Sequence, residues 1–174
     1  FVNLSKKKYF LMYNGSTLFL DRDGVINKKL DGRYVCSFKE FLFMPGSLSA
    51  ISKLSDVFQF IIIITNQQGI GKGLMTKSDL EHVHDEMIKE ISKKGGRIDA
   101  IYYCPDLASK KCNCRKPGTK MFENAFKDFP KIDIKKSYMI GDSDSDIEAG
   151  KAMHLNTIKV DNNYTLAKWT EEFL

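Results

Sequence analysis

The chain has 174 residues and a formal net charge of +5, with 43% of its residues hydrophobic and 28% charged. This length and composition are typical of one folded domain and exclude an intrinsically disordered protein. The longest unbroken apolar run, residues 60–64, is far too short to cross a membrane. We therefore expect a single domain over residues 1–174, in which residues 1–11 form an extension ahead of the first strand.

The lysines are spread along the chain and do not gather on one helix face. A solvated surface that attracts a small anionic substrate is therefore a better interpretation of the positive charge than a nucleic-acid groove. The first residues contain no continuous apolar segment of the kind that a secretory signal has. The four cysteines suit a reducing compartment better than a disulfide framework. We expect a cytoplasmic monomer with no nucleic-acid or membrane partner.

Apolar runs rich in β-branched and aromatic residues alternate along the chain with stretches of helical periodicity. The predicted strands cover residues 17–20, 58–64, 98–104, 137–140 and 156–160. The predicted helices cover about 46–55, 76–94, 117–129 and 144–154, followed by a short helix, WTEEFL, at the edge of the sheet. The strands are almost continuously apolar, which indicates a sheet buried on both faces and hence parallel strands joined by helices. The sequence therefore predicts an α/β fold.

The helix predicted over residues 76–94 is the clearest helix of the chain. Thr76 and Asp79 have the spacing of a capping box at its start, and the glycines at 95–96 end it. His82 and His84 lie two residues apart, on different faces of this helix. We therefore interpret them as surface residues and not as a pair of metal ligands.

Reactive polar residues directly follow three of the predicted strands: DRDG follows the first, TNQ the second and GDSDSD the fourth. Ligands of an open parallel sheet bind at the carboxyl ends of the strands, so we expect these segments to meet in one crevice. Asp21 and Asp23 repel each other unless a divalent cation lies nearby, and Asp142 supplies a third carboxylate. Oxygen ligands of this kind predict a Mg²⁺ site that meets phosphate oxygens.

The same residues suggest a reaction. One carboxylate can attack phosphorus and form an aspartyl-phosphate, while the other acts as general acid for the leaving alcohol and as general base for water. Thr65 and Asn66 can donate hydrogen bonds to the phosphoryl oxygens. Lys116 can offset the charge of those oxygens in the transition state.

Four segments, FLDRDGVIN, IITNQ, CRKP and IGDSDSDIEAG, match in order the four motifs of the haloacid dehalogenase (HAD) superfamily of phosphatases. More closely, the chain resembles the subfamily of heptose bisphosphate and histidinol-phosphate phosphatases. This resemblance implies a Rossmann-like three-layer sandwich with a parallel central sheet. No long insertion interrupts the chain where superfamily members carry a cap domain, so we expect no cap domain.

The resemblance also implies roles for individual residues. It implies that Asp21 is the nucleophile and Asp23 the general acid and base, and that Thr65 and Lys116 stabilise the phosphoryl group. It implies that Mg²⁺ is bound by Asp21, by the backbone carbonyl of Asp23 and by Asp142. Three roles are open for Asp146: it supports Lys116, supports the metal ligands, or caps the following helix.

Relatives carry Cys-Pro-His, a loop and then Cys-x-Cys-Arg-Lys-Pro, in which three thiolates and the imidazole bind a structural zinc ion. The corresponding residues here are Cys104, Asp106, Cys112 and Cys114, so a carboxylate replaces the imidazole. A carboxylate can ligate Zn²⁺. Two interpretations are therefore open: a structural zinc ion with Asp106 or water as the fourth ligand, or three buried thiols without a metal.

The loop after the first strand, NKKLDGRYVCSFKEFLFMPG, resembles that of the heptose bisphosphate phosphatases, with Arg33 as an additional residue. The five-residue gap between Asp106 and Cys112 is instead typical of the histidinol-phosphate phosphatases. We give the loop more weight because we expect it to overhang the crevice. The candidate substrate contacts are Gly32, Tyr34, Asn66, Gln67, Gln68 and Arg115.

The sequence thus predicts a Mg²⁺-dependent phosphatase that hydrolyses a phosphate monoester of a small sugar phosphate. The expected substrate is D-glycero-D-manno-heptose 1,7-bisphosphate, a precursor of surface polysaccharide, and histidinol phosphate is the alternative. A non-catalytic sugar-phosphate-binding module is the alternative from another class of protein. That alternative predicts at least one broken motif, whereas all four motifs are intact.

Overall fold

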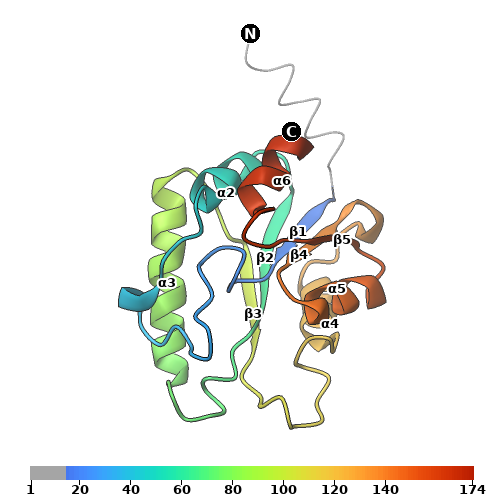
Figure 1. Ribbon diagram of the computed structural model, residues 1–174. Coiled ribbons are helices and arrows are strands. Elements are labelled where there is room, and N and C mark those ends of the chain that lie inside the picture. The colour runs from blue at the N-terminus through green and yellow to red at the C-terminus, as the bar shows by residue number, and fades with distance from the viewer. Residues whose placement is uncertain (1–14) are drawn as a thin grey trace.

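The computed structural model describes residues 15–174, and the expected extension, residues 1–11, lies outside them. Five parallel strands form one sheet in the order β3-β2-β1-β4-β5 (Figure 1). The strands are β1 (Thr17–Leu20), β2 (Phe60–Asn66), β3 (Ala100–Cys104), β4 (Tyr138–Gly141) and β5 (Asn156–Lys159). The predicted α/β fold is confirmed, and each predicted strand agrees with the observed one to within two residues at either end.

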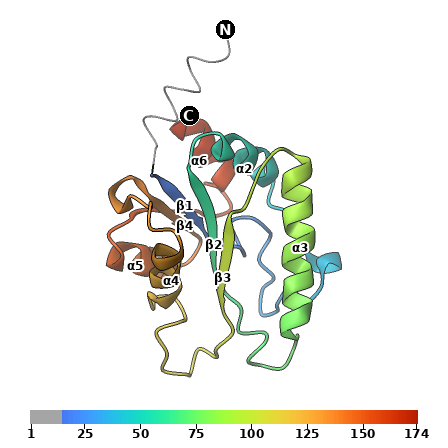
Figure 2. The same cartoon turned by 180° about the vertical axis from the view of Figure 1, so that it is seen from behind.

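Helices cover both faces of the sheet, as Figures 1 and 2 show from opposite sides. One face packs against α2 (Ser47–Ser55), α3 (Lys77–Lys93) and α6 (Leu166–Phe173). The other face packs against α4 (Lys120–Asp128) and α5 (Asp144–Ala152). Two 3₁₀ helices, η1 (Phe38–Glu40) and η2 (Ile134–Lys136), lie in the connections. The expected three-layer sandwich is therefore confirmed.

Alternation of side chains along β1 connects the sheet to both helix layers. Leu18 and Leu20 belong to the core shared with α2, α3 and α6. Phe19 points to the opposite face, where its ring packs edge-on against Phe122 at a centroid distance of 5.3 Å. All four residues of β1 are buried, as expected for a strand that has neighbours on both sides and helices on both faces.

The position of β1 in the middle of the sheet explains where a ligand can bind. The chain runs outward from β1 through β2 to β3, and then returns to the other side of β1 to form β4 and β5. Connections therefore leave β1 and β4 in opposite directions, and a crevice opens at the carboxyl ends of strands at such a switch point. The segments that follow β1 and β4 border this crevice.

Helix α3 begins as predicted but buries one residue that was expected on the surface. The Thr76 hydroxyl accepts a hydrogen bond from the Asp79 amide at 3.1 Å, and the Asp79 carboxylate accepts one from the Thr76 amide at 2.8 Å. His82 is exposed, as predicted, but His84 is only 6% exposed, so the prediction was wrong for His84. It lies on the buried face of α3 with Leu80 and Met87, and its ring is bonded to the buried guanidinium of Arg22.

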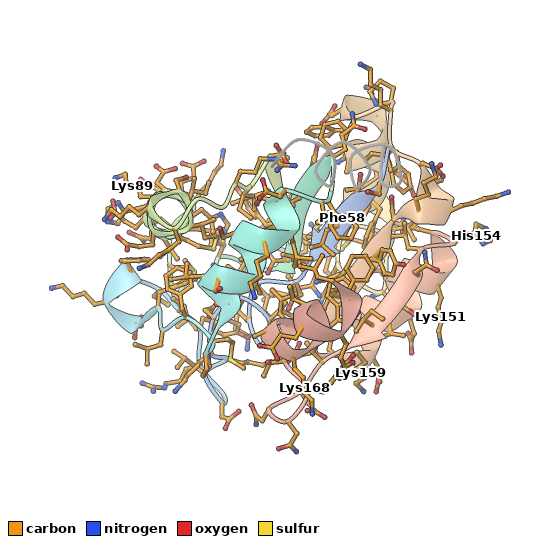
Figure 3. All side chains as sticks on the ribbon, turned by 90° about the horizontal axis from the view of Figure 1, so that it is seen from above. Phe58, Lys89, Lys151, His154, Lys159 and Lys168 are labelled. Atoms are coloured by element: carbon orange, nitrogen blue, oxygen red, sulfur yellow. The ribbon has the colours of Figure 1, made fainter. Side chains whose placement is uncertain are left out.

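Helix α6 exists near the predicted position, but its place at the edge of the sheet was wrong. Trp169 is 5% exposed and belongs to the core formed with α2 and α3. The Phe173 ring stacks on Phe58, just before β2, at a centroid distance of 5.6 Å. Viewed from above, Phe58 lies among the side chains beneath α2 and α6 (Figure 3). The helix therefore packs on one face of the sheet, at the end opposite to the crevice.

The connections at the crevice are loops and not an inserted domain. Residues 21–46, after β1, contain η1 as their one named element, and residues 67–76, after β2, contain none. Neither of these two loops, both within the described residues, is long enough or structured enough to form a cap domain. No helix in residues 15–174 has both the length and the apolar character needed to cross a membrane.

Candidate active site

A cavity of about 360 Å³ lies at the carboxyl ends of β1, β2 and β4. Polar and charged side chains from four separate segments line it. These include Asp21, Asp23, Lys29, Arg33, Tyr34, Asn66, Gln68, Lys72, Arg115, Lys116, Asp142, Ser143, Ser145 and Asp146. The parallel sheet thus brings together the three segments that follow the first, second and fourth predicted strands.

Asp21 and Lys116 form a buried ion pair at the base of this cavity. The two residues are 7% and 3% exposed, and Lys116 Nζ lies 2.7 Å from Asp21 Oδ1. Burial raises the pKa of Asp21 to about 7, against the attraction of Lys116 and with the repulsion of Asp146 and Asp23. Burial also opposes the charge of Lys116, but Asp21 and Asp146 hold its pKa above the usual value. Lys116 is therefore a permanent cation beside the predicted nucleophile.

Asp146 combines two of the roles that the sequence left open. Its Oδ1 lies 2.6 Å from Lys116 Nζ, and its Oδ2 accepts hydrogen bonds from the Ser143 amide and hydroxyl at 3.0 and 2.7 Å. It therefore caps α5 and supports Lys116 at the same time. A Cβ atom on Gly141 would lie 2.2 Å from the Asp146 Cβ, so the end of β4 needs glycine at this position.

Carboxylates from two strand ends gather where a cation can bind. Asp21, Asp142 and Asp146 each offer an oxygen within 4.8 Å of the others. Asp142 Oδ1 is buried and has no hydrogen-bond partner, and Asp142 Oδ2 lies 2.6 Å from Lys29 Nζ. Gly24, with φ of +91°, leaves room for Asp142, since a Cβ there would lie 2.6 Å from its carboxyl group. The oxygen donors and the unpartnered Oδ1 fit a hard divalent cation such as Mg²⁺.

Asp23 is held by three side chains. Arg22 Nη2 donates to both of its oxygens at 3.0 Å, Asn27 Nδ2 donates to Oδ1 at 2.9 Å, and Gln67 Nε2 donates to Oδ2 at 2.9 Å. Burial alone would raise the pKa of Asp23, but Arg22 and the hydrogen bonds together lower it below its usual value. The carboxylate is therefore ionised and fixed in orientation at the wall of the cavity.

Two predicted site residues at the carboxyl end of β2, Thr65 within the strand and Gln67 just after it, lie behind the cavity wall. Thr65 and Gln67 are each 1% exposed, and neither belongs to the cavity lining. Gln67 Nε2 donates to Thr65 Oγ1 at 3.0 Å as well as to Asp23. The structure therefore does not bring Gln67 to a substrate. Its Nε2 already donates to Asp23 and Thr65, so Gln67 positions Asp23 instead.

Asn66 links β2 to the loop that carries the lysine. Its side-chain Oδ1 accepts from the Lys116 amide at 3.0 Å, and its Nδ2 donates to the Lys116 carbonyl at 3.2 Å. These two bonds fix the backbone of Lys116. Asn66 also lines the cavity, together with Arg115, whose buried Nη1 has no hydrogen-bond partner. An unpartnered guanidinium nitrogen at a cavity wall suits an anionic ligand.

Three expected substrate contacts from the loops after β1 and β2 reach the cavity. Gly32, Tyr34 and Gln68 all belong to its lining. Gln68 Nε2 donates to Tyr34 Oη at 2.7 Å, and Gln68 Oε1 accepts from the Ala108 amide at 3.1 Å. Gln68 thus connects the loop after β1 with the cysteine-containing loop.

The cysteine-containing loop, residues 104–114, forms a second cluster of metal-binding residue types. Cys104, Asp106 and Cys114 offer ligand atoms within 4.8 Å of one another, and the Cys112 thiol is hydrogen-bonded to Asp106. Lys110 Nζ lies 2.7 Å from Asp106 Oδ1. Burial raises the thiol pKa of Cys104 and of Cys114. The two sulfurs and the carboxylate of this group, with the Cys112 thiol beside Asp106, are ligand types that bind Zn²⁺.

Sequence reasoning missed Lys29, Arg22 and Asn27 as parts of this site. Asn27 belongs to the DRDGVIN segment, so its distance of four residues from Asp23 was a usable signal. The partner of Lys29 is 113 residues away in the chain, and that pair carries no local signal.

Known proteins share both the sequence and the fold of this chain. Residues 113–173 match a family model described as HAD-hydrolase-like. The chain is 39% identical over 141 residues to a D-glycero-β-D-manno-heptose-1,7-bisphosphate 7-phosphatase of Rhodopseudomonas palustris, covering 77% of each chain. It is 40% identical over 141 residues to the corresponding α-anomer enzyme of Campylobacter jejuni, covering 81% of this chain and 79% of that protein.

A solved structure is similar as well. It is the crystal structure of D,D-heptose 1,7-bisphosphate phosphatase from B. bronchiseptica, complexed with magnesium and phosphate. Its TM-score is 0.83 at 30% sequence identity, and the match covers 91% of this chain and 97% of that chain. The chain therefore belongs to the heptose-1,7-bisphosphate 7-phosphatase family of HAD-like phosphoric monoester hydrolases.

Proposed function

We propose that this chain is a Mg²⁺-dependent phosphatase whose preferred substrate is D-glycero-D-manno-heptose 1,7-bisphosphate. The observation that carries the proposal is the buried Asp21–Lys116 pair at the base of a cavity that Asp23, Asp142 and Asp146 also border. The names of the relatives support the choice of sugar phosphate. A buried carboxylate next to a permanent cation suits a nucleophile that attacks a negatively charged phosphoryl group.

In the proposed mechanism, an Asp21 oxygen attacks phosphorus, and the bond from phosphorus to the sugar oxygen breaks. Asp23 is ionised in the free protein, so it must first take up a proton, which the negative charge of the bound phosphoryl group favours. It donates this proton to the departing oxygen and then removes one from the water that hydrolyses the aspartyl-phosphate. Lys116 offsets the charge of the phosphoryl oxygens, whereas Thr65, behind the cavity wall, accepts the hydrogen bond that orients Gln67. Asp21, Asp142 and the backbone carbonyl of Asp23 would hold Mg²⁺, which when bound neutralises phosphate charge.

Five of the six proposed substrate contacts line the cavity: Gly32, Tyr34, Asn66, Gln68 and Arg115. The ammonium group of Lys72 lies over the Tyr34 ring, with Lys72 Nζ 5.1 Å from the ring centroid. Cationic groups therefore surround the space that a second phosphate of the substrate would enter. A bisphosphate suits such a cavity better than a neutral sugar ester does.

The substrate proposal predicts a clear preference in steady-state kinetics. With Mg²⁺ present, kcat/KM for the heptose bisphosphate should exceed that for histidinol phosphate by about 10- to 100-fold, because one additional well-placed ionic contact contributes roughly 1.5–3 kcal/mol. EDTA should abolish both activities, and added Mg²⁺ should restore them. A preference for histidinol phosphate would show that the heptose assignment is wrong.

We further propose that residues 104–114 bind a structural zinc ion through Cys104, Asp106, Cys112 and Cys114. The cluster supports this proposal by its composition and by its position just before Lys116, where a rigid loop would fix the catalytic lysine. Buried thiols with raised pKa values are protonated on their own. A bound Zn²⁺ would hold them as thiolates, and Lys110 would offset part of the resulting negative charge.

Metal analysis of protein purified without chelator or nickel should find about one zinc per chain. Cys104→Ser should lower the zinc content several-fold and reduce the thermal stability, since a zinc ligand is lost. Cys36→Ser is the matched control, because Cys36 lies outside the loop and should leave the zinc content unchanged. Wild-type protein free of zinc would instead favour three thiols without a metal, of which Cys104 is buried and Cys112 and Cys114 are half-buried.

A further inference from the structure

Arg22 is a fully buried cation that the proposed chemistry does not use. It is 0% exposed, although it stands between the two catalytic carboxylates in the sequence. Its guanidinium donates to Asp23 through Nη2 at 3.0 Å and meets His84 Nε2 of α3 through Nη1 at 3.2 Å. The Phe41 ring lies 5.9 Å from its Cζ. Burying a guanidinium costs free energy of hydration, which an opposite charge and hydrogen bonds in good geometry must offset.

The chemistry of the contact fixes the state of His84. A guanidinium has only donors, so the Nε2 atom that faces it must be an acceptor. His84 is therefore neutral, with its proton on Nδ1. Burial and the charge of Arg22 lower the pKa of His84 to about 3, in agreement with this assignment. His84 thus holds Arg22 from the side opposite to Asp23.

Both oxygens of Asp23 receive two hydrogen bonds each. Oδ1 accepts from Arg22 and Asn27, and Oδ2 accepts from Arg22 and Gln67. Arg22 is the charged member of this set and the one that touches both oxygens. The Asp23 side chain remains 22% exposed toward the cavity. A chain of contacts therefore runs from α3 through His84 and Arg22 to the wall of the site.

We propose that Arg22 and His84 are positioning residues that hold the Asp23 carboxylate where it can exchange a proton with the leaving group and with water. This inference rests on the proposed function, in which Asp23 is the general acid and base. The arrangement orients Asp23 through a helix that contributes no residue to the cavity lining. Arg22 and His84 themselves do not line the cavity.

A test can use leaving groups that differ in their need for a proton. A sugar alkoxide leaves only with protonation, whereas 4-nitrophenolate is stable enough to leave without it. The departure of the leaving group contributes to kcat/KM for both substrates. In Arg22→Met, kcat/KM for the heptose bisphosphate should fall about 100-fold, within the usual range for general acid catalysis. The value for 4-nitrophenyl phosphate should fall less than about 5-fold, because it lacks that dependence.

His84 provides a second, milder pair of variants. His84→Leu removes the acceptor and should lower kcat/KM for the sugar phosphate about 10-fold, again selectively. His84→Gln offers a side-chain oxygen to Arg22 and should restore most of the activity. Arg97→Met is the control for general destabilisation, because Arg97 donates to the carbonyls of Phe58 and Gln59, far from the cavity. It should leave the ratio of the two kcat/KM values unchanged.

Asp23→Asn separates the two levels of the hypothesis. One outcome is a selective loss in Asp23→Asn while Arg22→Met and His84→Leu lower kcat/KM equally for both substrates. In that case the positioning role is wrong and the proposed function stands. If Asp23→Asn itself shows no selective loss, the assignment of the general acid is wrong, and the positioning role falls with it. Selective loss in all three variants, with recovery in His84→Gln, supports the inference.

Discussion

Asp21→Asn is expected to abolish turnover in a protein that remains folded. The amide cannot attack phosphorus, so the aspartyl-phosphate does not form and kcat should fall by more than about 10⁴-fold. Substrate affinity should change little, because Lys116, Arg115 and the proposed Mg²⁺ ligand Asp142 stay in place. The measurement is phosphate release from the heptose bisphosphate, with ligand binding by calorimetry as the control. Activity near wild type would show that another group is the nucleophile.

The same substitution should stabilise the metal-free protein at neutral and higher pH. The folded pKa of Asp21, about 7, lies above the ordinary value of 3.8 because burial opposes its charge. A group of this kind stabilises the fold fully below pH 4, and the contribution is lost as pH rises through 7. Since each pKa unit corresponds to about 1.4 kcal/mol, the advantage of the asparagine is at most about 4 kcal/mol at pH 8.

Chemical denaturation in EDTA, at pH 4.5 and at pH 8, measures this effect. The difference in unfolding free energy between Asp21→Asn and wild type should be small at the lower pH and largest at the higher one. A difference that does not depend on pH would contradict the raised pKa. A positive result would mean that the site holds a destabilising charge for the sake of activity, as functional sites often do.

The sequence was sufficient for the fold because its signals are local. Each strand is a short apolar run bounded by turn residues, and the rule for parallel sheets then brings Asp21 and Asp142 to one crevice. The position of His84 could have been predicted too. It lies four residues after Leu80 and three before Met87, on the buried stripe of α3. The interpretation as a surface residue gave the polarity of histidine more weight than the helical period.

Other features depend on tertiary contacts that no local pattern encodes. Arg22 is buried, although a charged residue in a loop is normally exposed. Its partner His84 lies 62 residues away in the chain, so no local pattern indicates the contact. The same is true of the contact between Gln68 and the amide of Ala108, which joins two loops across 40 residues. The motifs predict which residues react, whereas the side chains that contact those residues became visible only in three dimensions.

Lys116→Met should damage both catalysis and stability. Lys116 Nζ lies 2.7 Å from Asp21, 2.6 Å from Asp146 and 2.5 Å from the Ile64 carbonyl oxygen. Removing it leaves two buried carboxylates without their cation, which costs about 3–5 kcal/mol of unfolding free energy. Loss of the charge that faces the phosphoryl oxygens should lower kcat about 10³-fold. Lys89→Met, at an exposed position on α3 (Figure 3), should change neither quantity measurably.

A double-mutant cycle separates the electrostatic origin of this instability from simple loss of packing. In the Asp21→Asn background one of the two carboxylates is already neutral, so Lys116→Met should destabilise the protein less than it does in wild type. The expected coupling is about 1–3 kcal/mol, measured by denaturation at pH 8 in EDTA. Packing around the lysine stem is the same in both backgrounds and cancels in the cycle. Additive effects would therefore mean that Lys116 stabilises the fold through its aliphatic chain and its bonds to Asp146 and Ile64, and not through Asp21.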